Sequence, residues 1–407
     1  MRSKVIGPLA DTVAGARAEA VLRACVHCGM CNAVCPTFQL TGDELDGPRG
    51  RIYLMKGALE GEPVGPETLL HLDRCLECRA CESACPSGVE YHRLLDVGRP
   101  FVEAKVGRPL QQQLLRDLIR WVTISPTIFH AAASLGRLFS AVLPQALRRK
   151  VEVLNPIPHA PRSSPGVQAD RKMTLLAGCV QSAAAPHFNA AAERVFAKVG
   201  IDLTENSAAG CCGAVSFHLD APEEAKAHAR RNIDAWLAEI DTGAAAVIVT
   251  ASGCAAFIKD YPDLLAEDPA YADRARRIAD LVRDPVEVLD AAPLPAIRPP
   301  AEPRIAVHEP CTLRHGLKLG GRVEALLRGL GYDPQPVRDA HLCCGSAGPY
   351  SLLQPTFAKA LRDNKLAALN EHDPAAICTG NIGCWMHLAE ASPTPVRHWI
   401  EAVDDVT

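Results

Sequence analysis

The sequence predicts a multidomain fold, in which a helical N-terminal part is followed by two α/β copies of an internal repeat. Three observations support this prediction. The chain has 407 residues, which is enough for two or three domains. Its N-terminal part carries two cysteine runs of identical spacing within segments of helical pattern. Its C-terminal part repeats a second cysteine pattern at a nearly constant interval.

Eight cysteines form the two N-terminal runs. They read Cys25-x₂-Cys28-x₂-Cys31-x₃-Cys35-Pro36 and Cys75-x₂-Cys78-x₂-Cys81-x₃-Cys85-Pro86, with the same offset at every position. This spacing is typical of bacterial proteins that hold a pair of [4Fe–4S] clusters, in which the fourth cysteine of each run binds the cluster of the other run. We therefore expect cluster one at Cys25, Cys28, Cys31 and Cys85, and cluster two at Cys75, Cys78, Cys81 and Cys35. Zinc sites more often use two CxxC pairs, and disulfides require an oxidising compartment.

Helical segments surround the runs. Apolar residues at helical spacing predict a helix within residues 1–24, and further helices are expected at 51–59 and 67–72. The insert between the runs is longer and more helical than the spacer of a small bacterial ferredoxin. These features favour an α-helical ferredoxin domain over 1–154, including trailing helices. Proline and polar residues predict a linker at 155–172.

The C-terminal part contains the internal repeat. Cys179, Cys211-Cys212-Gly213 and Gly253-Cys254 recur as Cys311, Cys343-Cys344-Gly345 and Gly383-Cys384, at one offset for the first three cysteines and a slightly shorter one for the last. Each copy begins with a short apolar strand, expected at 173–179 and 304–311, and continues with alternating helices and strands, which predicts a parallel α/β layer. The copies are assigned to 173–292 and 304–407, separated by a proline-rich linker at 293–303.

The repeated cysteines are candidate metal ligands. Two adjacent thiols can serve one site only where the backbone bends, and the glycine that follows them permits this bend. The cysteines also lie near predicted strand ends, where α/β sheets place ligands. Two sites are therefore expected, one at Cys179, Cys211, Cys212 and Cys254, and the other at Cys311, Cys343, Cys344 and Cys384. Iron–sulfur clusters, zinc and buried structural thiols remain the alternatives.

Composition and motifs limit the remaining function classes. The formal net charge of −4 provides no basic surface for nucleic acid. The sequence has no GxGxxG after a strand and no P-loop, so we expect no nucleotide cofactor, and no catalytic residue is identified. Arg49, Arg51, Arg74 and Arg79 flank the runs, and positive charge near a cluster favours its reduced form.

Localisation follows from the cysteine content and the apolar stretches. Seventeen cysteines without an evident export signal predict the cytoplasm, where thiols stay reduced. The stretch 118–143 is apolar, but Ser125-Pro126 interrupts it, so it falls short of a membrane span. It is either a pair of packed helices or a surface that docks on a membrane. Peripheral association with the inner face of the cell membrane is therefore an alternative.

Several segments are more specific than the cysteine spacing alone. They are VLRACVHCGMCNAVCPTFQL, TGDELDGPRGRIYLMK and HLDRCLECRACESACPSGVEYH, and AGCCGAV, RNIDAW, TASGC, HLCCGSAG, LRDNK, NIGC and VRHWIE. Through these segments the chain resembles the iron–sulfur subunits of glycolate oxidase (glycolate dehydrogenase). The resemblance implies an α-helical ferredoxin domain followed by two repeated α/β cysteine-rich (CCG) domains. It also implies an oxidoreductase acting on CH–OH groups, in which FAD-containing partner subunits oxidise glycolate to glyoxylate. This subunit would pass the electrons to a quinone or another membrane acceptor.

The chain departs from one pattern among related CCG proteins. Heterodisulfide-reductase-type copies commonly end in CxxC, whereas Ala251 and Asn381 stand at the first cysteine position here. A site with five thiolates is therefore excluded at these positions. Two alternatives to the glycolate assignment remain. One is the equivalent subunit of a glycerol-3-phosphate or lactate dehydrogenase complex, and the other is a heterodisulfide-reductase-like thiol redox enzyme.

Overall fold

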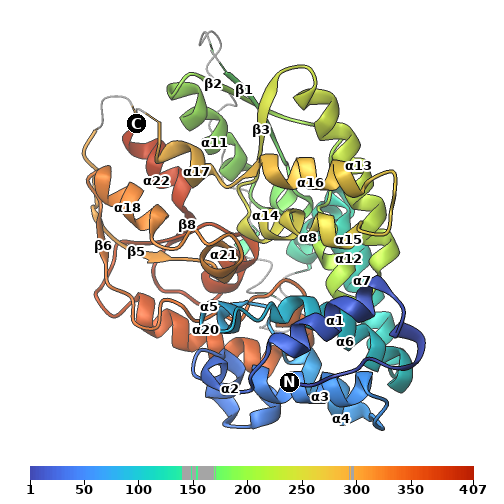
Figure 1. Ribbon diagram of the computed structural model, residues 1–407. Helices are drawn as coiled ribbons and strands as arrows, with labels where there is room; N and C mark the ends of the chain where they lie inside the picture. Colours follow the sequence, from blue (N-terminus) through green and yellow to red (C-terminus); the bar gives the residue numbers. More distant parts are fainter. Residues whose placement is uncertain (140–147, 149–152, 155–168, 170, 293, 295–297) are drawn as a thin grey trace. The chain divides into compact units, whose positions relative to one another are not determined.

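The computed structural model describes residues 1–139, 148, 153–154, 169, 171–292, 294 and 298–407 (Figure 1). Most of the predicted linker 155–172 and part of the linker 293–303 lie outside the described residues. The chain forms two compact units. The first contains Met1–Arg116 and His341–Lys365, and the second contains Asp117–Ala340 and Leu366–Thr407. The segment with Cys343 and Cys344 thus belongs to the first unit, although its sequence is part of the second repeat.

The first unit is helical throughout, which confirms the predicted helical ferredoxin-type domain. Its elements are η1 (Gly7–Leu9), α1 (Val13–Ala24), η2 (Met30–Asn32), α2 (Pro36–Thr41), η3 (Glu44–Asp46), α3 (Pro48–Leu59), α4 (Pro66–Asp73), α5 (Ala80–Ser83), α6 (Tyr91–Val106), the start of α7 (Leu110–Ile124), α19 (Tyr350–Leu353) and most of α20 (Pro355–Leu369). Proline occupies the first position of α2, α3 and α4, where the missing N–H costs no hydrogen bond.

The core of this unit lies where α1, α3 and α6 meet. Leu22, Met55 and Leu94 are fully buried there. A Cβ atom at Gly98 of α6 would lie 2.5 Å from Met55 Sδ, so the close approach of α3 and α6 requires glycine. This packing fixes the helices that carry both cysteine runs.

The second unit contains two four-stranded parallel sheets. One has the order β2-β1-β3-β4 and the other β6-β5-β7-β8. The strands are β1 (Arg171–Leu175), β2 (Ile201–Glu205), β3 (Ala244–Ile248), β4 (Val282–Arg283), β5 (Arg304–His308), β6 (Asp333–Gln335), β7 (Ala376–Thr379) and β8 (Val396–His398). The identical strand order confirms the predicted α/β repeat. Both sheets contribute to one hydrophobic core, which includes Leu175, Phe196, Ile305 and Trp399.

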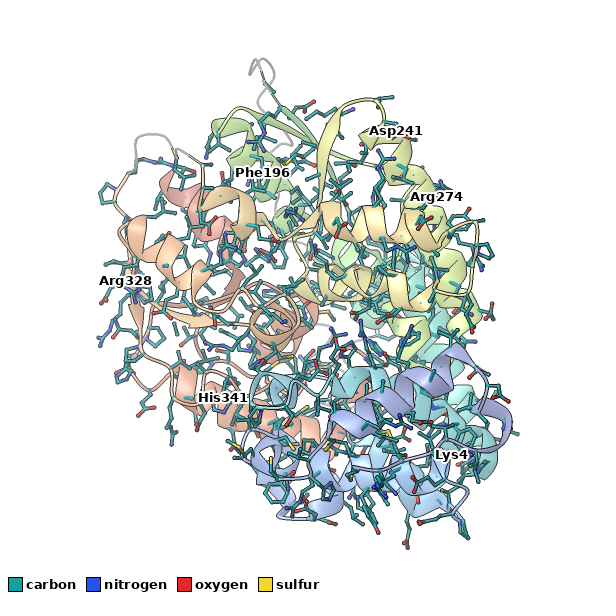
Figure 2. All side chains as sticks on the ribbon, viewed as in Figure 1. Lys4, Phe196, Asp241, Arg274, Arg328 and His341 are labelled. Carbon is teal, nitrogen blue, oxygen red and sulfur yellow. The ribbon has the colours of Figure 1, made fainter. Side chains whose placement is uncertain are left out.

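Helices connect and cover these sheets. They are α8 (Pro126–Leu138), α10 (Cys179–Ala184), α11 (Pro186–Lys198), α12 (Ala214–His218), α13 (Pro222–Ile240), α14 (Ser252–Lys259), α15 (Tyr261–Leu264), α16 (Ala272–Leu281), α17 (Pro285–Leu289), the π-helical turn η5 (Thr312–Gly316), α18 (Arg322–Gly329), α21 (Ile382–Ala389) and α22 (Trp399–Val406). Figure 2 shows their side chains on the ribbon. Within the described part of the chain, no helix is long and apolar enough to cross a membrane.

One detail of the repeat differs from the prediction. The initial apolar segments were expected to extend to the cysteines at 179 and 311, but β1 ends at Leu175 and β5 ends at His308. Cys179 begins α10, and Cys254 and Cys384 lie in the first turns of α14 and α21. The reason is the βα connection itself, because a parallel strand is followed by a turn into the next helix.

Candidate metal centres

The first predicted cluster set lines a single cavity. Cys25, Cys28, Cys31 and Cys85 surround about 440 Å³ of empty volume, together with apolar Ile52 and Val89. Cys25 follows α1, Cys28 and Cys31 lie on the next turn, and Cys85 follows α5. Two runs that are far apart in the sequence therefore contribute to one site, as the cross-over pattern predicts.

The second predicted set lines another cavity of the first unit. Cys35, Cys75, Cys78 and Cys81 surround about 410 Å³ of empty volume, together with Arg51 and Tyr91. Cys81 also lines the first cavity, so the two are neighbours. Each cavity thus offers at least the four thiols that a [4Fe–4S] cluster requires.

Unusual backbone conformations shape these loops. His27, Glu77 and Arg79 have φ values of 60°, 54° and 59°, and Gly29 has 86°. Residues other than glycine rarely adopt this left-handed region, at a cost on the order of 1–3 kcal/mol each, and such strain is concentrated at functional sites. The strain therefore marks the loops between the cysteines as parts of a binding site.

Burial controls the protonation of the thiols. It raises the pKa of Cys31 to about 11 and raises the pKa of Cys25, Cys75 and Cys81. Positive charge on Arg51 opposes the effect of burial on the pKa of Cys75. Because thiolates are the ligands, metal binding must displace protons from these sites, and loading is coupled to pH.

A buried group of charges lies beside the second cavity. The Arg51 side chain is 1% exposed, and its Nη1 lies 4.0 Å from Cys35 Sγ. Arg51 also donates to His71 O at 2.8 Å and to Thr37 Oγ1 at 3.1 Å. The buried carboxylate of Asp46 bonds to His71 Nδ1 at 2.8 Å and to Arg74 Nη1 at 2.9 Å, and lies 3.8 Å from Arg51. Of the four arginines that the sequence indicated, Arg51 thus lies beside the predicted ligand Cys35, whereas Arg49 is partly exposed and pairs with Glu44.

The four cysteines of the first repeat come together in the second unit. Cys212 Sγ lies 3.3 Å from Cys254 Sγ, and Cys211 is hydrogen-bonded to both Cys179 and Cys212. Gly213 has φ of 91°, which provides the bend that the adjacent thiols require. Tyr261 Oη donates to Cys212 O at 2.7 Å and holds this bend in place.

These hydrogen bonds shift the pKa values of neighbouring thiols in opposite directions. Hydrogen bonds from Cys179 and then Cys212 lower the pKa of Cys211 well below its ordinary value. The same hydrogen bonds raise the pKa of Cys179 and of Cys212. A thiol with a lowered pKa beside other thiols favours the binding of a metal cation.

The cysteines of the second repeat belong to two units. Cys311 and Cys384 lie in the second unit, whereas Cys343 and Cys344 lie in the first. Cys343, Cys344 and Cys384 are buried. Gly345 has φ of 87°, and a Cβ there would lie 2.6 Å from Ala358 O, so this bend again requires glycine. The local geometry of the two CCG turns is therefore alike.

The comparisons with known proteins agree with this arrangement. A family model described as "4Fe-4S dicluster domain" matches residues 21–89, and one described as "Cysteine-rich domain" matches 173–259 and 305–389. The chain is 48% identical over 404 residues to the "Glycolate oxidase iron-sulfur subunit" of Escherichia coli (strain K12), which covers 99% of this chain and 98% of that protein. The chain belongs to the glycolate oxidase iron–sulfur subunit family.

More distant relatives extend this result. The "Probable glycolate oxidase iron-sulfur subunit" of Bacillus subtilis (strain 168) is 30% identical over 407 residues, which covers 91% of this chain and 89% of that protein. "Lactate utilization protein A" of Bacillus licheniformis is 24% identical over 243 residues, which covers 57% of this chain and 99% of that protein. The predicted resemblance is confirmed, and the chain is an iron–sulfur electron-transfer component of an oxidoreductase.

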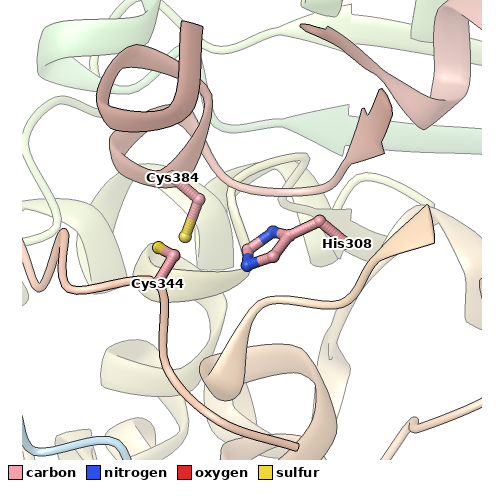
Figure 3. Close-up of side chains that lie close together, drawn as sticks. All are labelled: His308, Cys344 and Cys384. Carbon is pink, nitrogen blue, oxygen red and sulfur yellow. The ribbon is translucent and has the colours of Figure 1, made fainter. Parts of the chain in front are cut away.

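The sequence reasoning missed one candidate ligand of the second unit. His308 ends β5, just before Cys311, and one of its ring nitrogens lies within 4.8 Å of Cys384 Sγ (Figure 3). The signal was available, because the equivalent position of the first repeat is Leu176. A histidine that breaks a repeat near its cysteines is a candidate ligand, since imidazole and thiolate bind the same metal ions.

Proposed function

We propose that this chain is the electron-transfer subunit of a glycolate dehydrogenase complex. FAD-containing partner subunits oxidise glycolate to glyoxylate, and this chain passes the electrons to a quinone-type acceptor. The observation that carries the proposal is the pair of neighbouring cavities in the first unit, each lined by at least four cysteines. Identity of 48% to a glycolate oxidase iron–sulfur subunit supports the choice of substrate.

Eight thiols would hold the cofactors of this proposal. Cys25, Cys28, Cys31 and Cys85 would hold one [4Fe–4S] cluster, and Cys75, Cys78, Cys81 and Cys35 the other. When bound, the clusters divide the two-electron oxidation into one-electron steps, whereas the organic chemistry belongs to the flavin. The loops hold the thiols toward the cavities, and Arg51 supplies a buried positive charge next to Cys35.

Electron exchange with a partner requires an accessible edge. Cys28 is the exposed cysteine of the first set, and Val26, Met30 and Tyr53 are exposed near it. Val26 and Met30 line the same cavity as Cys28. A small apolar patch around an exposed ligand suits the limited interfaces that electron-transfer partners form. The first cavity is thus the side from which electrons enter or leave.

The proposal includes peripheral association with the inner face of the cell membrane. Exposed apolar side chains occur on α7, at Leu110, Leu114, Leu115, Leu118 and Trp121. Leu110, Leu114, Leu118 and Trp121 recur every three or four residues and form one stripe along the helix. Leucine and tryptophan on one helix face suit the boundary between lipid headgroups and acyl chains. Residues 140–143 of the predicted apolar stretch lie outside the described residues.

Reconstitution with the flavoprotein partners tests the function. The complex is purified without oxygen, and glycolate-dependent reduction of a soluble quinone is measured. A Cys78→Ser variant should lose quinone reduction, while glycolate should still reduce the partner flavin. The matched control Cys378→Ser removes a buried thiol of β7 that belongs to none of the predicted sets. Full quinone reduction by Cys78→Ser in an assembled complex would contradict the proposed electron path.

A lactate-oxidising complex is the second candidate. It is favoured by the match to Lactate utilization protein A, which covers 57% of this chain. The flavoprotein that co-purifies with the chain, assayed with glycolate and with lactate, distinguishes the two. Faster flavin reduction by lactate would replace the glycolate assignment and leave the electron-transfer role in place.

A further inference from the structure

The second repeat places a histidine beside one of its cysteines. His308 ends β5, and Cys384 is the third residue of α21. Figure 3 shows the imidazole directed toward the Cys384 side chain, and a ring nitrogen lies within 4.8 Å of the sulfur. His308 is 3% exposed and Cys384 is 4% exposed. Both side chains are therefore shielded from water.

The sheet fixes the orientation of this imidazole. β5 pairs with β7 so that His308 lies opposite Thr379, and His308 Nδ1 is hydrogen-bonded to Thr379 Oγ1 at 2.9 Å. Histidines that bind metals through one ring nitrogen characteristically hold the other nitrogen in a hydrogen bond, which fixes the ring. The Thr379 contact thus assigns metal binding to Nε2. Asn381 Nδ2 lies 3.4 Å from Cys384 Sγ and donates to it.

Distances distinguish a single ion from a cluster. Around one tetrahedral zinc with bonds of about 2.3 Å to sulfur and about 2.0 Å to nitrogen, neighbouring ligand atoms lie roughly 3.5–3.8 Å apart. The thiolates of a [4Fe–4S] cluster bind different irons and lie farther from one another. The cysteines of the first unit line open cavities, whereas the sulfur atoms of Cys212 and Cys254 lie 3.3 Å apart. The sulfur spacing in the first repeat is therefore closer to that of two ligands on a single ion than to that of two ligands of a cluster.

We propose that His308 and Cys384 are ligands of one tetrahedral Zn²⁺ ion in the second repeat. A further thiolate of the same unit would come from Cys311, which follows His308 by three residues in the sequence. Mixed thiolate and imidazole sites of this kind are typical of structural zinc. The inference is independent of the electron-transfer proposal, because zinc does not exchange electrons.

Metal content and X-ray absorption test the site in the full-length chain. The iron-loaded protein should contain zinc, and its zinc absorption edge should report sulfur at about 2.3 Å with a nitrogen contribution at about 2.0–2.1 Å. His308→Ala should lose one zinc per chain and the nitrogen contribution, with the iron content unchanged. Retention of all the zinc with an unchanged ligand shell would overturn the proposal, as would zinc-free protein that is fully loaded with iron.

Three variants separate ligation from folding. His308→Cys keeps a metal-binding side chain, so zinc should remain while the nitrogen contribution disappears. Thr379→Val removes only the orienting hydrogen bond and should weaken zinc binding by about 10–100-fold, the usual effect of losing such a support. His130→Ala removes an exposed histidine of α8 and should change nothing. A nitrogen contribution that persists in His308→Cys would show that another residue binds the ion.

Measurements on the same samples distinguish a failure of the zinc proposal from a failure of the proposed function. Glycolate-dependent quinone reduction reports on the clusters of the first unit, and zinc absorption reports on the second repeat. Normal electron transfer in zinc-free protein would overturn the zinc site alone. Loss of electron transfer with intact zinc would count against the proposed function alone.

Discussion

With the proposed ligand sets, replacing Arg51 with methionine should lower the reduction potential of cluster two. The guanidinium lies 4.0 Å from Cys35 Sγ and is 1% exposed, so water screens its charge weakly. Two unit charges at this distance interact by about 4 kcal/mol at an effective dielectric constant of about 20. The electron added on reduction spreads over the whole cluster, and Asp46 at 3.8 Å opposes the positive charge. We therefore expect roughly a third of this value, about 1.4 kcal/mol, which is a tenfold change and about 59 mV for one electron.

Electron paramagnetic resonance during an anaerobic redox titration measures this shift. In Arg51→Met, the reduction potential of one cluster should lie about 59 mV below its value in the parent protein, and the potential of the other cluster should be unchanged. Arg51→Lys keeps the charge and should retain most of the potential, which separates the charge effect from packing. Arg49→Met removes a partly exposed arginine and should have a smaller effect. If both clusters of Arg51→Met titrate as in the parent protein, the assignment of Arg51 to cluster two is wrong.

Three other predictions concern stability. Gly98→Val should lower the free energy of unfolding by about 1–3 kcal/mol, because the new side chain crowds Met55. The control Gly65→Ala adds a methyl group in open space and should change the free energy of unfolding little. Equal unfolding temperatures for the two variants would contradict this packing. Burial raises the pKa of Asp284 to about 8, so between about pH 4 and 8 the folded state holds a proton that the unfolded state releases. The free energy of unfolding should therefore fall as the pH rises from about 4 to 8. In Asp284→Asn, chemical denaturation should show this loss reduced by at least about 1.4 kcal/mol. Burial lowers the pKa of His398 to about 4, so stability should also fall as pH drops from about 6.5 to 4, and His398→Asn should remove that part of the decline.

The two runs of closely spaced cysteines could be recognised in the sequence because their spacing is local. Cysteines so closely spaced lie on one turn, whatever the remainder of the chain does. The internal repeat was equally visible, since equal intervals between cysteines survive changes in the residues between them. The strand order was not evident. The short strand β6, Asp333–Gln335, contains Pro334, which is acceptable because β6 is an edge strand.

The charges around cluster two could not be predicted in the same way. In sequence, Arg51 is one arginine on a helix whose neighbours give no sign that its side chain is buried. Its burial depends on Asp46 and on the carbonyl of His71, in the following helix, which only tertiary packing brings together. His308 is a similar case, because its significance depends on Cys384, which follows much later in the chain.

The shared lining of the two cavities has a consequence for the biogenesis of the protein. With the proposed ligand sets, cluster one needs Cys85 and cluster two needs Cys35, so neither can be completed before both runs have left the ribosome. A scaffold protein that delivers iron and sulfide must then meet a nascent chain that is already exposed as far as Cys85. Both ligand sets therefore become available at the same stage of synthesis, and neither cluster can be inserted into a chain that ends before Cys85.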